Sequence, residues 1–350
     1  MSPANVLDKY YLAITVLVTI GFQLSGFAIA WTLQFDKITD FTGGSNFFLL
    51  ALLTLLMGNE YHTRNIVASV LVMIWAVRTA GFLLFRVLKT GSDTRFDEIR
   101  SHFFKFLGFW FGEIFFYGLE TGIEVELGLF RANSLVSLPV TVLNSPAVSD
   151  VQKLGSDPSF GTACDIVGII LWGIGWIIES LADMQKFRAK NSGNAPKDMP
   201  VQVGVWRYSR HPNYFAEMLC WWGIWLLSIS PTTNGSLPSS TRSAQYGTVV
   251  SPLFTMVLLM FGSGIPTAEK PTAKRFFLMS CGDDARYPNA WQNYKEYLRN
   301  TSILIPLPPA LYRRLPEVIK RTVLLDFSFY QFDEGKDGAA AIEETRGDGL

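Results

Sequence analysis

Residues 204–230 read GVWRYSRHPNY followed by FAEMLCWWGIWLLSIS. The first part holds two arginines, a histidine, an asparagine and two tyrosines, whereas the second carries Glu217 as its one charged residue. An apolar run of this kind predicts a membrane helix. Because ionisable side chains are costly in or near hydrocarbon, a cluster of them at the mouth of such a helix also predicts a functional site.

The composition favours a membrane protein throughout. Hydrophobic residues make up 49% of the chain and charged residues 17%, which fits a multi-pass membrane protein better than a soluble one. The net charge of zero argues against nucleic acid as a partner, since that needs a basic face. Three widely separated cysteines predict neither a disulfide framework nor a metal site. We therefore expect membrane lipids as the surroundings of an all-α bundle of transmembrane helices.

Apolar stretches long enough to cross about 30 Å of hydrocarbon recur along the chain. Five such stretches are Tyr10–Trp31, Asn65–Phe85, Gly161–Ala182, Asn213–Ser230 and Gly247–Ile265. A shorter stretch, Phe41–Gly58, spans the hydrocarbon only if its polar start Gly43-Gly44-Ser45-Asn46 is counted. A further region, 102–146, is apolar at both ends but interrupted by acids and Arg131 within 111–131.

The positions of basic residues indicate how many membrane spans the region 102–146 contains. The loops 86–100 and 186–210 both contain several lysines and arginines, which places both on the cytoplasmic side. An even number of crossings must separate them, so we predict one span within 102–146, carrying residues 111–131 as an insertion. The expected fold is a bundle of about seven spans, with the N-terminus outside and the C-terminus inside.

The chain divides by composition near residue 310. Residues 1–310 form the predicted membrane domain. Residues 311–350, called the tail below, are first basic and then acidic, with Gly and Ala near their end. Low hydrophobicity and clustered charge predict that the tail is disordered.

The polar turn before the Asn213–Ser230 run suits an anionic ligand. Arginine forks bind phosphate bidentately, aromatic faces suit flat rings, and a helix N-terminus favours negative charge. Asn213 stands where an N-cap is expected, and Glu217 follows one turn later on the same side. Snorkelling arginines in an interfacial aromatic belt are the simpler alternative, but they do not explain a buried Glu217 beside Asn213.

Further polar groups lie at the ends of other spans. Asp183 and Lys186 close the Gly161–Ala182 span, and Glu269 follows the Gly247–Ile265 span. Tyr294 and Tyr297 recur at helical spacing in a polar segment and are candidates to contact a ligand. These groups could equally form ion pairs and packing contacts.

Together these motifs resemble one known family. The stretch Gly204–Glu217, with Trp221-Trp222-Gly223 after it, is similar to the signature of the steroid 5-alpha-reductase-like (DUF1295) membrane proteins. Other elements agree in order, among them Arg78–Arg86, Glu179–Lys186 and Leu304-Ile-Pro306. The resemblance covers roughly residues 10–310.

The resemblance implies that the chain binds NADPH between its last helices and cytoplasmic loops. Carried over residue by residue, the cofactor-binding positions are Asp183, Lys186, Arg207, Arg210, His211, Asn213, Tyr214, Glu217, Glu269, Tyr294 and Tyr297. The phosphates are expected among Lys186, Arg207, Arg210 and His211.

The function expected from the resemblance is NADPH-dependent reduction of a carbon–carbon double bond in a sterol or similar lipid taken from the bilayer. The candidates for the catalytic acid are Tyr214, Glu217, Glu60 and Tyr61. The endoplasmic reticulum is the expected location for a eukaryotic lipid reductase. Two alternatives stay open: a methyltransferase that uses S-adenosylmethionine, as in the isoprenylcysteine carboxyl methyltransferases, and a non-catalytic lipid-binding protein.

Overall fold

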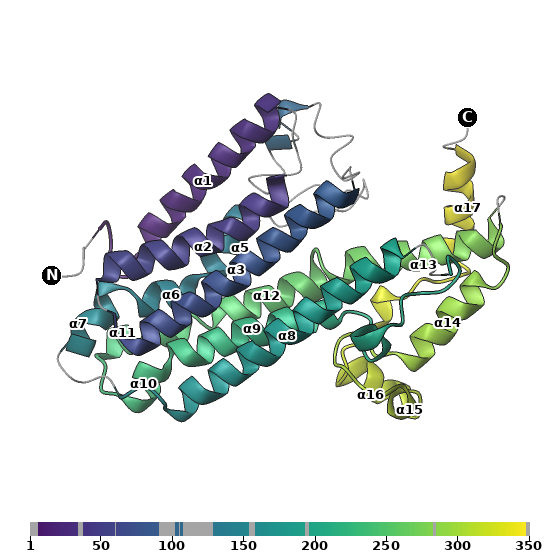
Figure 1. The fold of residues 1–350 in the computed structure, drawn as a ribbon. Coiled ribbons are helices and arrows are strands. Elements are labelled where there is room, and N and C mark those ends of the chain that lie inside the picture. The colour runs from purple at the N-terminus through teal and green to yellow at the C-terminus, as the bar shows by residue number, and fades with distance from the viewer. Residues whose placement is uncertain are drawn as a thin grey trace. The chain divides into compact units, whose positions relative to one another are not determined.

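A computed structural model describes residues 6–33, 38–59, 61–90, 102–104, 106–107, 129–153, 158–192, 196–282 and 285–347. Within these ranges the regular structure is helical, and no strand occurs beyond an isolated bridge between Ser209 and Ser302. The prediction of an all-α fold is thereby confirmed (Figure 1).

Among the residues that the structure describes, five helical segments are long and apolar enough to cross a membrane, as expected of an integral membrane protein. Four are the single helices α1 (Leu12–Leu33), α2 (Thr39–Gly58), α3 (Thr63–Thr90) and α8 (Ala163–Asn191). The fifth is the run Ser239–Cys281, which comprises α11 (Ser239–Gly247), α12 (Val250–Phe261) and α13 (Ile265–Cys281).

The predicted count of seven spans is not confirmed. Helix α9 (Pro212–Ser228) has 17 residues, fewer than the other candidates. In the region 102–146, the described part from residue 129 onward forms short helices: α5 (Leu129–Val136), α6 (Leu138–Leu143) and, just beyond it, α7 (Pro146–Lys153). Pro139 and Pro146 each lie at the start of a helix, where proline is tolerated, so they divide this stretch into separate helices. Most of the proposed insertion 111–131 lies outside the described residues.

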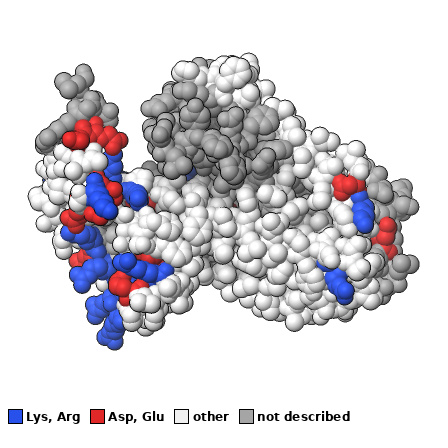
Figure 2. Space-filling view, turned by 180° about the vertical axis from the view of Figure 1, so that it is seen from behind, with Lys and Arg blue, Asp and Glu red and all other residues white. Residues whose placement is uncertain are grey.

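Apolar side chains cover much of the outside of these helices. Leu17 on α1, Val77 on α3 and Ile170 on α8 are 54%, 60% and 53% exposed. In the face shown in Figure 2, charged side chains gather in a few groups, and broad areas of the described surface carry none. Such a surface is suited to contact with lipid.

The described chain separates into two compact units. Unit 1 comprises Met1–Trp176 and Met218–Leu258, and unit 2 comprises Ile177–Glu217 and Leu259–Leu350. This division differs from the predicted boundary near residue 310, because residues 177–217 and 259–310 group with the tail.

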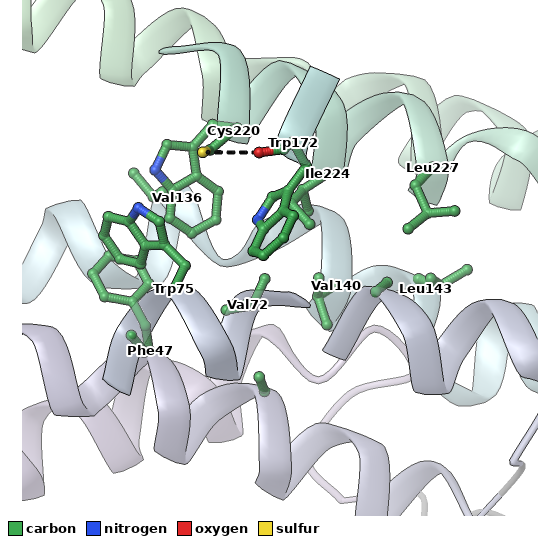
Figure 3. Packing of buried hydrophobic residues seen from close by; sticks show 14 of the residues in the cluster. Phe47, Val72, Trp75, Val136, Val140, Leu143, Trp172, Cys220, Ile224 and Leu227 are labelled. Atoms are coloured by element: carbon green, nitrogen blue, oxygen red, sulfur yellow. Dashed lines mark hydrogen bonds between the residues drawn. The ribbon is translucent and has the colours of Figure 1, made fainter. Parts of the chain in front are cut away.

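Aromatic side chains form the core of unit 1 (Figure 3). Trp75 of α3 meets Phe47 of α2 and Trp221 of α9 edge-on, with ring centroids 5.3 Å and 5.1 Å apart. Trp172 of α8 joins the same cluster, and its carbonyl accepts a hydrogen bond from the Cys220 thiol at 3.6 Å.

Polar side chains are also buried within unit 1, and several bind one another. Asn144 donates to the hydroxyls of Thr54 and Ser69 at 3.2 Å and 2.9 Å. Arg64 at the start of α3 binds both carboxylate oxygens of Asp165 at 2.8 Å and 3.0 Å, and both side chains are fully buried. Paired in this way, they are stabilised where isolated charges would be strongly destabilising.

Helices α8 and α9 touch through two glycines in unit 1. A Cβ built on Gly168 would lie 2.6 Å from the carbonyl oxygen of Gly223, and one built on Gly223 would lie 2.5 Å from the carbonyl oxygen of Gly168. Because the obstructing atoms are backbone, neither position has room for a side chain. Small residues of this kind let membrane helices approach closely.

We predict that Gly168→Ala lowers the free energy of unfolding by about 1–3 kcal/mol, because overpacking forces the two backbones apart. The matched control is Gly173→Ala on the same helix, where an added Cβ meets nothing within 4 Å. That change should be neutral or slightly stabilising. Denaturant titration in detergent measures both variants, and equal losses would contradict the proposed contact.

The tail was predicted to be disordered, but its described residues form helices and turns. Its described residues form the end of α15 (Pro309–Tyr312), then α16 (Glu317–Thr322), the 3₁₀ turn η4 (Ser328–Tyr330) and α17 (Asp337–Gly347). Tyr312 and Tyr330 are 1% and 2% exposed. These buried aromatic side chains pack the tail against the rest of unit 2. The charged composition of the segment gave no indication of these apolar contacts.

Candidate functional site

The signature 204–211 begins with a tight turn against the end of α8. Gly204 has a φ of +54°, and the 3₁₀ turn η3 (Gly204–Arg207) follows. The amide of Val205 donates to the Gln185 side chain at 2.9 Å, and the Trp206 indole donates to the carbonyl of Ala182 at 2.8 Å. This turn therefore needs glycine at its first position and tryptophan at its third.

The second half of the signature pairs with residues 302–307 through the backbone. Arg210 and His211 donate their amides to the carbonyls of Ser302 and Ile303 at 2.8 Å and 3.1 Å, and Leu307 donates to the carbonyl of Tyr208 at 3.0 Å. The Ser209 hydroxyl adds a bond to the Leu304 carbonyl at 2.8 Å. Two motifs almost a hundred residues apart thus form one structure.

The Arg210 side chain lies between two carboxylates. Its guanidinium binds Glu269 of α13 and Asp326 of the tail, each at 2.5 Å, and all three residues are 6–7% exposed. Burial alone would lower the pKa of Arg210, but the carboxylates of Glu269 and Asp326 outweigh it and raise that pKa. Arg210 is therefore a fixed cation whose two terminal nitrogens are both engaged.

His211 shares the Glu269 carboxylate with Arg210. Its Nε2 lies 2.8 Å from the second oxygen of Glu269, and its ring stacks on Tyr214 with centroids 5.1 Å apart. Burial lowers the pKa of His211, despite the opposing effect of Glu269. The ring is thus neutral near pH 7, and a carboxylate partner places its proton on Nε2.

Four tyrosines surround this centre. Tyr312 donates its hydroxyl to Asp326 at 2.7 Å, Tyr297 donates to the Trp206 carbonyl at 3.3 Å, and Tyr330 donates to the Met260 carbonyl at 2.6 Å. The ring of Tyr294 stacks on Phe276 with centroids 4.8 Å apart. Burial raises the pKa of all four phenols, so each stays protonated and available as a hydrogen-bond donor.

A cavity of about 1020 Å³ opens onto Arg210, Glu269 and Asp326. Tyr294, Tyr312 and Tyr330 contribute to its wall. Two polar atoms of the centre, Nε of Arg210 and Oδ1 of Asp326, are buried without a hydrogen-bond partner among the described residues. Unpaired polar atoms beside a large cavity are the expected state of a site that takes a polar ligand.

Several residues predicted for the site meet in unit 2. Arg210 and His211 both bind Glu269, and Tyr214 stacks on His211. Tyr294 lies on the wall of the cavity onto which Arg210 and Glu269 open. Tyr297 bonds to the signature turn, and the Lys186 ammonium lies over the ring of Trp206, 4.3 Å from its centroid.

Other predicted residues are placed differently. Arg207 is exposed and Asp183 half-buried. Asn213 is not an N-cap, because α9 begins at Pro212. Its Oδ1 is buried and has no hydrogen-bond partner within the described ranges. Glu217 is half-buried within α9. Tyr61 belongs to unit 1 and is 55% exposed.

Glu60 lies outside the described residues. Asp326, Tyr312 and Tyr330 were missed by sequence reasoning because they belong to the tail. Their one signal was the aromatic content of residues 327–330, which read FSFY and are unusual in a disordered segment.

Comparison with known proteins identifies the family. The profile of DUF1295, described as a protein of unknown function, matches residues 26–278, which is most of the chain. The chain belongs to the DUF1295 family. This is the steroid 5-alpha-reductase-like family, so the resemblance noted in the sequence is confirmed. The matched residues include Arg210, His211 and Glu269, whereas Asp326 lies beyond them.

A relative is found in Schizosaccharomyces pombe. It is an uncharacterized protein, 32% identical over 89 residues, which cover 21% of this chain and 26% of the relative. The chain therefore matches about a quarter of the length of that relative. No solved structure matches the chain significantly.

We predict that Asp326→Ala lowers the free energy of unfolding by about 3–5 kcal/mol, the usual cost of breaking a buried ion pair. The control is Glu334→Ala, which removes the partner of Lys295 in a pair that is 39% and 51% exposed. An exposed pair contributes at most about 1 kcal/mol. Denaturant titration in detergent compares the two, and similar small losses for both would show that Asp326 does not stabilise Arg210.

Proposed function

We propose that the chain is an NADPH-dependent membrane reductase that saturates a carbon–carbon double bond in a sterol-like or other lipid substrate. The observation that carries the proposal is the cavity beside the buried Arg210 centre, with its unpaired polar atoms and its wall of tyrosines and bases. Membership of a reductase-like family supports it. We further propose the endoplasmic reticulum membrane as its location.

The residues of the cavity fit a dinucleotide. Its volume of about 1020 Å³ is at the upper end of ligand pockets, as a molecule of that size requires. Tyrosine rings offer faces for flat rings, and the unpaired Oδ1 of Asp326 can accept a hydrogen bond from a ribose hydroxyl. When bound, NADPH supplies two electrons and one of the two hydrogens that the double bond gains.

Within this proposal, Arg210 positions other groups instead of binding phosphate. Both of its terminal nitrogens are occupied by Glu269 and Asp326. The guanidinium fixes these carboxylates, and Glu269 in turn fixes the His211 ring on which Tyr214 stacks. The loss of Arg210 should therefore disturb the whole wall of the cavity that is proposed to hold the cofactor.

The second hydrogen of the reduction must come from a protein acid. Tyr214 is the best candidate of the four residues proposed from the sequence, because it lies in the first turn of α9 against the neutral ring of His211. A phenol can polarise a substrate carbonyl or protonate the neighbouring carbon. Glu217 lies one turn further along α9 and is the second candidate.

We predict that NADPH raises the thermal stability of the purified protein, whereas S-adenosylmethionine does not. A ligand that binds only the native state adds about 2.7 kcal/mol at a hundred times its dissociation constant. Parallel thermal-shift titrations in detergent measure this, with Arg210→Ala expected to abolish the NADPH response. Stabilisation by S-adenosylmethionine alone would contradict the reductase proposal and support a methyltransferase. The absence of a response to either ligand would support a lipid-binding protein.

We also predict that Tyr214→Phe lowers the turnover of an enone sterol or long-chain enone by about 10²–10⁴-fold, the usual contribution of a general acid. Tyr208→Phe is the control, because that tyrosine belongs to the same signature but is 43% exposed. Consumption of NADPH in mixed micelles gives the rate. Equal rates for wild type and Tyr214→Phe would move the role of the acid to Glu217 or to another residue.

A further inference from the structure

The lysine and arginine side chains that line the cavity fall into two groups. Three are neutralised: Arg210 by Glu269 and Asp326, Lys295 by Glu334, and Lys320 by Glu317. The other three are Arg299, Arg313 and Arg314, which line the same cavity, are exposed, and form no ion pair with any described residue. We call these three the arginine rim.

The fold holds the arginine rim in place. Arg299 lies in the last turn of α14 (Ala290–Asn300), and α15 packs against that helix. Arg313 and Arg314 follow directly after Tyr312, which is buried and bound to Asp326. Their amides donate to the carbonyls of Pro309 and Leu311, each at 3.1 Å. The backbone of the rim is thus anchored to the Arg210 centre through one tyrosine.

The chemistry of the arginine rim suits a phosphate monoester. Guanidinium groups bind phosphate oxygens bidentately, and three of them match a group that carries a charge near −2 at pH 7. The acidic side chains that line the same cavity do not neutralise the positive charge of the arginine rim. Glu269, Asp326 and Glu317 already have basic partners, which leaves Glu296 alone opposite three arginines.

We propose that Arg299, Arg313 and Arg314 bind the 2′-phosphate that distinguishes NADPH from NADH, and so determine the choice of cofactor. This inference rests on the function proposed above. All three residues lie beyond the part of the chain that matches the family, residues 26–278, so the rim is built by this chain's own C-terminal segment. The 2′-phosphate is the only monoester in NADPH, and NADH lacks it.

The test compares ligands that differ by that one phosphate. Dissociation constants of the full chain in a non-ionic detergent are measured by calorimetry for NADPH and NADH, and for adenosine 2′,5′-bisphosphate and 5′-AMP. In wild type the phosphorylated member of each pair should bind more tightly. In Arg313→Gln/Arg314→Gln it should lose about 10- to 100-fold in affinity, as expected for lost hydrogen bonds to a charged group, while NADH and 5′-AMP stay unchanged.

The control is Arg286→Gln, an exposed arginine of the same unit that does not line the cavity. It should leave all four affinities unchanged. Thermal unfolding of each variant without ligand confirms that the fold is intact, which is expected because the substituted side chains are exposed.

Each outcome decides between the two proposals. If wild type binds neither dinucleotide, the proposed reductase function fails, and the rim inference fails with it. If wild type binds NADPH but the double variant keeps its preference, or loses NADPH and NADH equally, the rim inference alone is overturned. A further arm measures binding to vesicles that contain phosphatidic acid. If the double variant loses only vesicle binding, the arginines serve a lipid headgroup and the inference is again overturned.

Discussion

A buried guanidinium that needs two carboxylates organises unit 2. A charge removed from water is strongly destabilising unless it is paired and hydrogen-bonded, so Arg210 can be buried only if Glu269 and Asp326 reach it. These residues come from the signature turn, α13 and the tail, which are distant in the chain. Their meeting draws in His211 through Glu269 and Tyr312 through Asp326. The cavity wall is a consequence of this one requirement.

The interior of unit 1 obeys a different constraint. In a bundle surrounded by hydrocarbon, helices gain little from burying apolar surface against each other, so close backbone approach and internal hydrogen bonds matter more. The Gly168–Gly223 contact and the bonds of Asn144 to Thr54 and Ser69 are examples of each. The apolar side chains are free to face outward, which accounts for the uncharged surface in Figure 2.

The sequence predicted most of the long helices because their apolar runs are continuous. The ends of α1, α2 and α3 fall within a few residues of the expected spans. The prediction was wrong where packing against other parts of the chain determines where a helix ends. Pro139 and Pro146 divide a stretch expected to form one span, and α9 ends at Ser228, too short to count with the other candidates. The tail was misjudged because its charges dominate its composition, whereas its few aromatic residues determine its packing.

The same contrast holds for the site. Residue type and spacing singled out Arg210, His211, Glu269 and Tyr294, since polar groups beside an apolar run are unusual. No local pattern could show that both terminal nitrogens of Arg210 are already bound by carboxylates, because Asp326 lies 116 residues away. We therefore propose a positioning role for Arg210 in place of the expected role as a phosphate ligand, and we propose the three exposed arginines of the rim as the groups that bind an anion.

That separation of 116 residues also orders events during biosynthesis. At about 5–20 residues per second, translation reaches Asp326 roughly 6–23 s after Arg210. Glu269, which follows Arg210 by 59 residues, is made in between. For all of that interval the guanidinium can meet at most one of its two carboxylates. The centre therefore closes only after the helices that precede Asp326 have been synthesised, so the nascent chain must keep this cation hydrated or otherwise compensated until then.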